Sequence, residues 1–148
     1  MRLLTLILLK TGAAVSAAPI KERKFIMYKF DSFQFPFTSK EHEDFFTYAL
    51  HETGTAYPPN IAAIYLLSAT ADTRSRIWNM VDLDGNFYDD CWDCWQDLDT
   101  RRCVALAANL SCGGGSYPEL SPAYLYSGSM APVFRAAVEY WYSNPVGA

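Results

Sequence analysis

The sequence predicts an α+β fold: one amino-terminal helix packed on a small antiparallel sheet, a second helix at the carboxyl end, and stabilising disulfides. Helix signals begin at Thr38 and near Ser129, and the runs between them have the apolar or alternating character of strands. All four cysteines fall between Cys91 and Cys112. An order of extended segment, helix, strands and helix is typical of α+β proteins.

The first 17 residues have the features of a secretory signal peptide. Arg2 precedes an apolar run, and Val15-Ser16-Ala17 is a small-residue cleavage pattern. The run is too short to span a membrane, and no later apolar stretch is long enough either. We therefore expect a secreted single domain over residues 18–148, with a flexible start at 18–24 and a Gly/Ser/Pro-rich loop at 113–122.

The composition is that of an acidic, well-packed protein. The chain has 12 Lys and Arg against 16 Asp and Glu, a net charge of −4, and removal of the leader takes away two more basic residues. An acidic surface repels phosphate backbones, which disfavours RNA as a partner. Apolar residues make up 51% of the chain and aromatic residues 16%, which excludes a disordered protein.

Two helices carry clear boundary signals. Thr38 and Glu41 have the spacing of a capping box, and Gly54 is a natural stop. The second helix is expected over Ser129–Ser143, with Pro132 in its first turn. The apolar stripe of the first helix is made of Phe45, Phe46, Ala49 and Leu50.

Extended structure is expected between and before these helices. Aromatic and polar residues alternate over Phe25–Phe37, and Ile61–Thr70 is an apolar run typical of a buried strand. Asp84-Gly85 lies between apolar runs and predicts a hairpin over Arg76–Tyr88. Val104–Leu110 fits either a strand or a short helix.

The cysteines are spaced C-x2-C-x8-C-x8-C, at Cys91, Cys94, Cys103 and Cys112. Export to an oxidising compartment favours two disulfides, with the pairing open, over a zinc site. A bond within the short ring Cys91–Cys94 is strained unless it is a redox motif, and no thioredoxin-like context surrounds it.

An aspartate-rich segment from Asp82 to Asp99 suggests calcium as a possible ligand. Six residues fall on the ligand positions of a calcium loop: Asp82, Asp84, Asn86, Tyr88 through its carbonyl, Asp90 and Asp93. Phe87 stands where such a loop needs glycine, so the alternative is a solvated acidic turn.

Histidines are scarce. His42 and His51 lie nine residues apart on the expected helix, and about 100° per residue places them on opposite faces. We expect both to be exposed and unable to act together as acid and base. Separately, Asn109-Leu110-Ser111 is a glycosylation sequon, expected on a surface loop.

The order of elements resembles the small secreted fungal ribonucleases of the guanyl-specific type over about residues 28–92. The matching segments are Tyr28-Lys29-Phe30, Tyr48-Ala49-Leu50-His51-Glu52, Tyr57-Pro58, Ile64–Ser68, Ser75-Arg76-Ile77-Trp78 and Asp84-Gly85-Asn86-Phe87. The resemblance implies a concave sheet that carries Arg76 as the phosphate-binding arginine.

That family uses a histidine or glutamate base and a histidine acid. Here Pro59 and Ala63 stand near the base positions and Asp93 near the acid, so only Arg76 matches. Each proton-transfer group is typically worth 10²–10⁴-fold in rate. The resemblance therefore implies an inactive scaffold, similar to the ribonuclease-like effectors that plant-infecting fungi secrete for virulence.

The sequence thus predicts a secreted, non-enzymatic binding protein with no cofactor, whose partner is a host protein or glycan. Arg76, Trp92, Trp95 and Tyr117 are the candidate ligand-binding residues, although Trp92 and Trp95 fit equally well as packing around disulfides. The alternatives are a carboxylate-dependent hydrolase, with Glu119, Glu139 or the aspartates as its acids, and a carbohydrate-binding module.

Overall fold

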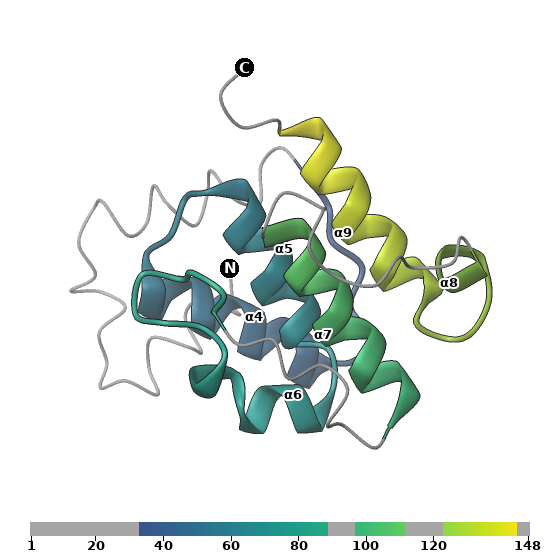
Figure 1. Ribbon diagram of the computed structural model, residues 1–148, viewed down its shortest axis with the longest axis horizontal. Helices are drawn as coiled ribbons and strands as arrows, with labels where there is room; N and C mark the ends of the chain where they lie inside the picture. The colour runs from purple at the N-terminus through teal and green to yellow at the C-terminus, as the bar shows by residue number, and fades with distance from the viewer. Residues whose placement is uncertain (1–32, 89–96, 112–122, 145–148) are drawn as a thin grey trace.

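The computed structural model describes residues 33–88, 97–111 and 123–144, and this part of the chain is helical (Figure 1). Its elements are α4 (Lys40–Thr53), α5 (Pro58–Leu67), α6 (Ala71–Ser75), the 3₁₀ helix η1 (Ile77–Asn79), α7 (Leu98–Ser111), α8 (Ala123–Tyr126) and α9 (Ala131–Ser143). Within these ranges the only β pairing is an isolated bridge between Val81 and Phe87. The predicted α+β fold on an antiparallel sheet is therefore wrong.

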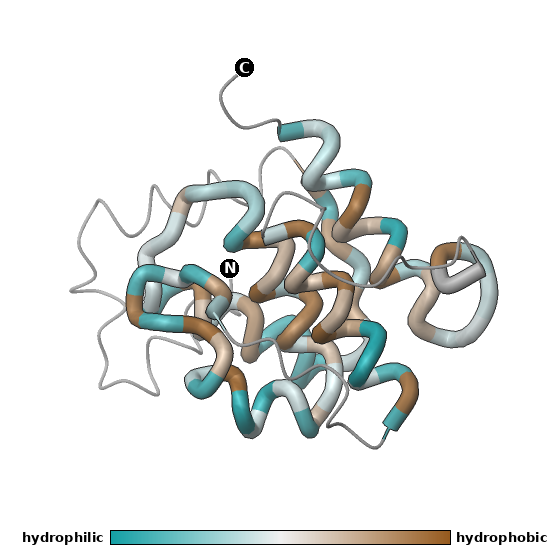
Figure 2. Tube along the Cα trace, viewed as in Figure 1, coloured by the Kyte–Doolittle hydropathy of each residue, from teal (hydrophilic) through white to brown (hydrophobic). Residues whose placement is uncertain are grey.

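Helix α5 forms the centre of the molecule. It packs against α4, α7 and α9, and every residue from Pro59 to Leu67 is buried. Figure 2 shows the hydrophobic residues gathered in these central helices. The strand predicted over Ile61–Thr70 is wrong because a helix covered on all sides is apolar all round and loses its periodicity. Pro58 and Pro59 occupy the first turn, where a missing N–H costs nothing.

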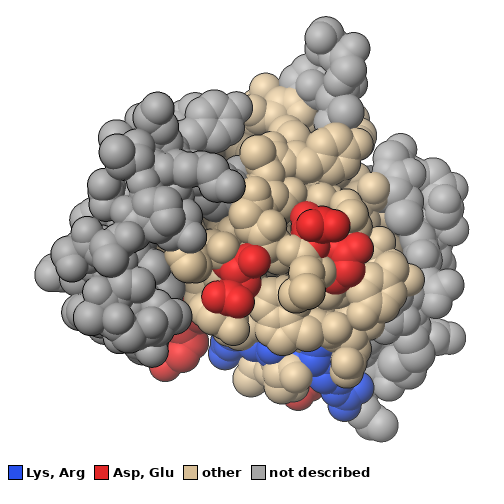
Figure 3. Space-filling model, turned by 90° about the vertical axis from the view of Figure 1, so that its left-hand side faces the viewer, with Lys and Arg blue, Asp and Glu red and all other residues tan. Residues whose placement is uncertain are grey.

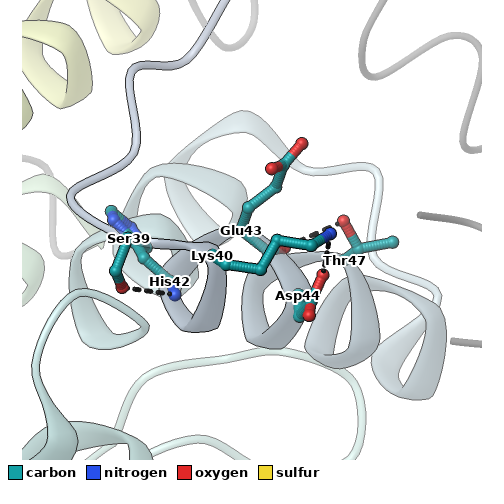
Figure 4. Close-up of polar contacts among 6 residues, drawn as sticks. All are labelled: Ser39, Lys40, His42, Glu43, Asp44 and Thr47. Atoms are coloured by element: carbon teal, nitrogen blue, oxygen red, sulfur yellow. Dashed lines mark hydrogen bonds and ion pairs between the residues drawn. The ribbon is translucent and has the colours of Figure 1, made fainter. Parts of the chain in front are cut away.

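Helix α4 begins and ends with capping contacts. The Ser39 side chain accepts a hydrogen bond from the His42 amide at 3.1 Å (Figure 4), so the helix starts close to the predicted Thr38. Lys40 and Asp44 form an ion pair at 3.0 Å one turn apart. Gly54 ends the helix at φ 63°. The face turned to the core comprises His42, Phe46, Thr47, Ala49 and Leu50.

The segment after α5 makes two short helices and a tight turn. The Thr70 side chain caps α6 reciprocally with Thr73. A turn that we call the 80–88 turn follows η1; the amide of Tyr88 donates to the carbonyl of Met80 at 2.8 Å. The expected reversal at Asp84-Gly85 is present, but the hairpin strands predicted from Arg76 onward are wrong because that stretch is helical.

Gly85 is held against the end of α4. Its φ is +89°, and a Cβ at this position would lie 2.9 Å from the Thr55 side chain. Gly85→Ala is therefore expected to lower the free energy of unfolding by about 3 kcal/mol, from backbone strain and overpacking together. Gly128 is the matched control, because φ is +91° there but nothing lies within 4 Å. Gly128→Ala should lower the free energy of unfolding in urea by about 1 kcal/mol. Equal losses in the two variants would show that a Cβ at position 85 is not destabilised by its contact with Thr55.

Helices α7 and α9 complete the packing around α5. Val104–Leu110, left open between strand and helix, belongs to α7. The expected second helix is present as α9, with Val133, Phe134 and Ala137 buried. The Trp141 indole nitrogen donates to the carbonyl of Leu110 at 3.0 Å, which fixes α9 to the end of α7.

None of the helices in the described ranges is long and apolar enough to cross a bilayer. The predicted signal peptide, flexible 18–24 segment and 113–122 loop lie outside the described residues, and secretion stays a prediction.

Cys103 is a free thiol, fully buried in α7. The prediction of a disulfide at Cys103 is wrong, because this side chain is a free thiol within the apolar core. The other predicted disulfide partners, Cys91, Cys94 and Cys112, lie outside the described residues.

The Cys103 thiol should be unreactive in the folded protein. Burial raises the pKa of this thiol, with Asp99 and Asp97 acting in the same direction, so almost no thiolate is present at neutral pH. We expect iodoacetamide to modify Cys103 only after unfolding in urea, as measured by peptide mass spectrometry. A disulfide-linked peptide that contains Cys103 after non-reducing digestion would contradict the prediction.

Candidate functional site

The predicted ligand-binding residues do not assemble into a described site. Arg76 is exposed between α6 and η1, and no concave sheet surrounds it because the described residues contain no sheet. Trp92, Trp95 and Tyr117 lie outside the described residues. The sheet implied by the resemblance to ribonucleases is therefore wrong, and the effector interpretation stays a prediction.

Asp82 uses its carboxylate to hold the 80–88 turn. One carboxylate oxygen accepts hydrogen bonds from the backbone amides of Asn86 and Asp84, each at 2.9 Å. These hydrogen bonds, that from Asn86 most, lower the pKa of Asp82. In the part of the chain that the structure covers, no three acidic, histidine or cysteine side chains are placed to hold a metal ion. Asp90 and Asp93 fall outside it, so calcium binding remains untested.

His42 is buried rather than exposed as expected. Its Nδ1 accepts a hydrogen bond from the Thr38 amide at 3.1 Å, so the ring proton is on Nε2. Nε2 donates that proton in a hydrogen bond to the Tyr65 carbonyl at 3.0 Å. Burial lowers the pKa of His42 to about 4, with Arg74 contributing in the same direction and the Tyr65 hydrogen bond opposing it. Nδ1 holds the segment that precedes α4, and Nε2 binds a carbonyl in the last turn of α5, so both ring nitrogens are engaged in holding the fold. His51 lies nine residues further along α4.

Two other predicted positions lie on helices. Asn109, expected on a surface loop, is half-buried near the end of α7. Glu139 is exposed on α9, while Glu119 falls outside the described residues. Glycosylation of Asn109 stays a prediction, and it would need this end of α7 to open.

Four aromatic residues of α4, η1 and the 80–88 turn are linked by two ring contacts and one hydrogen bond. The rings of Phe45 and Tyr48 lie 5.5 Å apart, and those of Tyr48 and Trp78 lie 6.4 Å apart. The Tyr88 hydroxyl donates to the Trp78 carbonyl at 3.1 Å. Trp78 is 37% exposed and Tyr88 57%. We call Phe45, Tyr48, Trp78 and Tyr88 the aromatic face.

Acidic side chains lie on two of the elements that form the aromatic face, α4 and the 80–88 turn. Glu41 and Glu52 lie four residues before Phe45 and four after Tyr48, on the same side of α4. Glu52 is close enough to Tyr48 to raise the pKa of its hydroxyl, after the larger effect of burial. Asp82 and Asp84 are exposed on the turn. Figure 3 shows acidic side chains in separate groups with uncharged surface between them, on the side of the molecule that lies at the left of Figure 1.

The 80–88 turn is anchored to the helices behind it. Asn60, buried in the first turn of α5, donates its side-chain amide to the Asn86 side chain at 3.0 Å. Gly85 packs on the Thr55 side chain, and the Tyr88 hydroxyl is hydrogen-bonded to the Trp78 backbone carbonyl. A turn fixed at three points loses little conformational entropy when a ligand binds.

Sequence reasoning missed the aromatic face. Phe45, predicted to lie in the core stripe, is only half-buried, and Tyr88, predicted to contribute its carbonyl, has an exposed side chain. The available signal was the spacing of Glu41, Phe45, Tyr48 and Glu52, which repeats at three and four residues on an outer side of α4.

Comparison with known proteins places the chain in a family without assigning a role. Residues 32–147 match the model of a family of unknown function (DUF6075). No curated protein and no solved structure gives a significant match. Since the family model covers most of the chain, including all of the described helices, this protein belongs to the DUF6075 family.

Proposed function

We propose that this protein is a non-enzymatic binding protein that contacts its partner through the aromatic face. The observation that carries the proposal is the partial exposure of Trp78 and Tyr88 in one connected cluster. Large aromatic side chains contribute most of the energy in many protein interfaces, and they lose little conformational entropy on binding.

The partner class that we propose is a protein. The aromatic face is formed by three chain segments and spans the surface of a helix, a 3₁₀ turn and a tight turn. A broad, firmly anchored surface of this kind suits an extended contact with a polypeptide. The use of His42 and Asp82 in holding the fold also supports binding over proton-transfer chemistry at those two groups.

Site-specific photo-cross-linking tests this proposal. Benzoylphenylalanine in place of Tyr88 should give protein adducts in cells of the source organism, and Trp78→Ala should reduce them. Tyr142, which is 70% exposed on α9, is the matched control position. Equal adducts from both positions would contradict the proposal. So would steady cleavage of RNA or oligosaccharides that one carboxylate substitution abolishes, or selective retention on a glycan array.

A further inference from the structure

We infer that the partner segment bound by the aromatic face is cationic: a polypeptide stretch rich in Arg or Lys, stacked on Trp78 and Tyr88 and paired with Glu52 and Asp84. This inference rests on the proposed function and adds the chemistry of the partner. It depends on the ring positions, the charge around them and the anchoring of the turn.

The exposed rings are suited to cations. Guanidinium and ammonium groups are attracted to the faces of Trp and Tyr, and Trp is the stronger of the two. The chain already contains one contact of this type, where the Arg135 guanidinium lies 5.6 Å from the centre of the Tyr126 ring. Trp78 and Tyr88, joined by the hydrogen bond from the Tyr88 hydroxyl to the Trp78 backbone carbonyl, both expose an aromatic ring to an outside cation.

The surrounding charge favours the same partner. Residues 33–88, which supply the whole aromatic face, contain seven acidic and three basic side chains. Among the basic ones, the Lys40 ammonium is paired with Asp44, and the Arg74 guanidinium donates to the Ser68 carbonyl at 2.8 Å. The third, Arg76, is exposed two residues before Trp78, so the segment keeps a net charge of 3 − 7 = −4, which a basic partner segment would neutralise.

The same charge argues against other classes of partner. Nucleic acids and anionic lipid surfaces carry negative charge and would be repelled by Glu52, Asp82 and Asp84. A second copy of this chain would bring the same acidic surface to the contact unless a different face were used. We therefore do not expect self-association through the aromatic face.

Fluorescence anisotropy with the purified full chain provides the test. The probes are three labelled peptides of equal length: one of Arg and Gly, one of Glu and Gly, and one of Ser and Gly. We expect the Arg peptide to bind and the other two to bind at least tenfold more weakly. Binding should be lost at about 1 M salt, where the Debye length is about 3 Å.

Variants connect this binding to the aromatic face. Trp78→Ala and Tyr88→Ala should each weaken Arg-peptide binding by roughly tenfold, and Tyr142→Ala should leave it unchanged. Glu52→Lys changes an exposed side chain at the end of α4, so it tests the charge requirement without disturbing the core. It should also weaken binding by about tenfold.

The outcomes separate the two proposals. Equal binding of the Glu peptide, or unchanged binding in Glu52→Lys, would overturn the cationic partner. Absence of peptide binding together with persistent cross-links from position 88 would refute the cationic chemistry and leave the binding surface standing. Loss of both would refute both proposals. Concentration-dependent dimerisation that Glu52→Lys abolishes would show that the occupant is a second copy.

Discussion

Replacing Tyr65 with alanine is expected to lower the free energy of unfolding by on the order of 4 kcal/mol. Tyr65 is fully buried in α5, and its ring packs among four others. Those neighbours are Phe35 at 4.5 Å, His42 at 4.9 Å, Phe46 at 5.5 Å and Phe37 at 5.9 Å between ring centres. Removal of a buried aromatic ring typically costs 3–5 kcal/mol, because the cavity closes only in part.

Tyr65→Phe is the matched control for this substitution. It keeps the ring and removes only the hydroxyl, which donates to the Pro36 carbonyl. The loss of this one hydrogen bond should cost about 1 kcal/mol. Urea unfolding followed by circular dichroism measures both variants. A Tyr65→Phe loss as large as that of Tyr65→Ala would show that the hydroxyl, and not the ring, stabilises this cluster.

The helices with marked boundaries were predictable from the sequence. Helix α4 has an N-terminal cap and Gly54, and α9 has Pro132 in its first turn and a one-sided apolar stripe. These signals arise from local interactions: capping of the helix ends, and the apolar stripe of a helix that buries one face. They can be recognised in the sequence without knowledge of the tertiary contacts.

The central helix was not predictable in the same way. Pro59 to Leu67 is buried on all sides, so its sequence has no polar face from which a period of 3.6 could be recognised. A buried strand and a buried helix of ten residues then give the same pattern. The wrong assignment of α5 produced a sheet, and the sheet in turn supported the resemblance to ribonucleases.

The aromatic face could be predicted only in part. The outer stripe of α4 is visible in the spacing of Phe45 and Tyr48, but Trp78 and Tyr88 join it through tertiary packing. Residues from three segments meet there because the 80–88 turn folds back onto the end of α4 at Gly85. No local pattern encodes that contact.

His42 should make the protein less stable in mild acid. The pKa of His42 is about 4 in the folded protein, against an ordinary value of 6.5. The unfolded chain therefore takes up the proton first as the pH falls. The stabilisation is complete above pH 6.5 and is lost progressively down to about pH 4, by about 3 kcal/mol in total.

The structural reason is the hydrogen bonding of the imidazole. A proton added at Nδ1 would face the Thr38 amide, which already points its own hydrogen at that nitrogen. The neighbouring Arg74 also opposes a positive charge there. Protonation should therefore break the contact between His42 and the Thr38 amide before α4, while the hydrogen bond to the Tyr65 carbonyl is kept.

Comparison of the parent protein with His42→Gln isolates this effect. The variant keeps a polar amide but has no titratable group, so it should be less stable at pH 7 and show a flatter pH dependence between 6.5 and 4. The free energy of unfolding in urea at closely spaced pH values provides the measurement, and the difference between the two proteins removes the contribution of all other titrating groups. Parallel curves over this range would mean that His42 is protonated as readily in the folded state as in the unfolded chain, and that the contact with the Thr38 amide does not require the neutral ring.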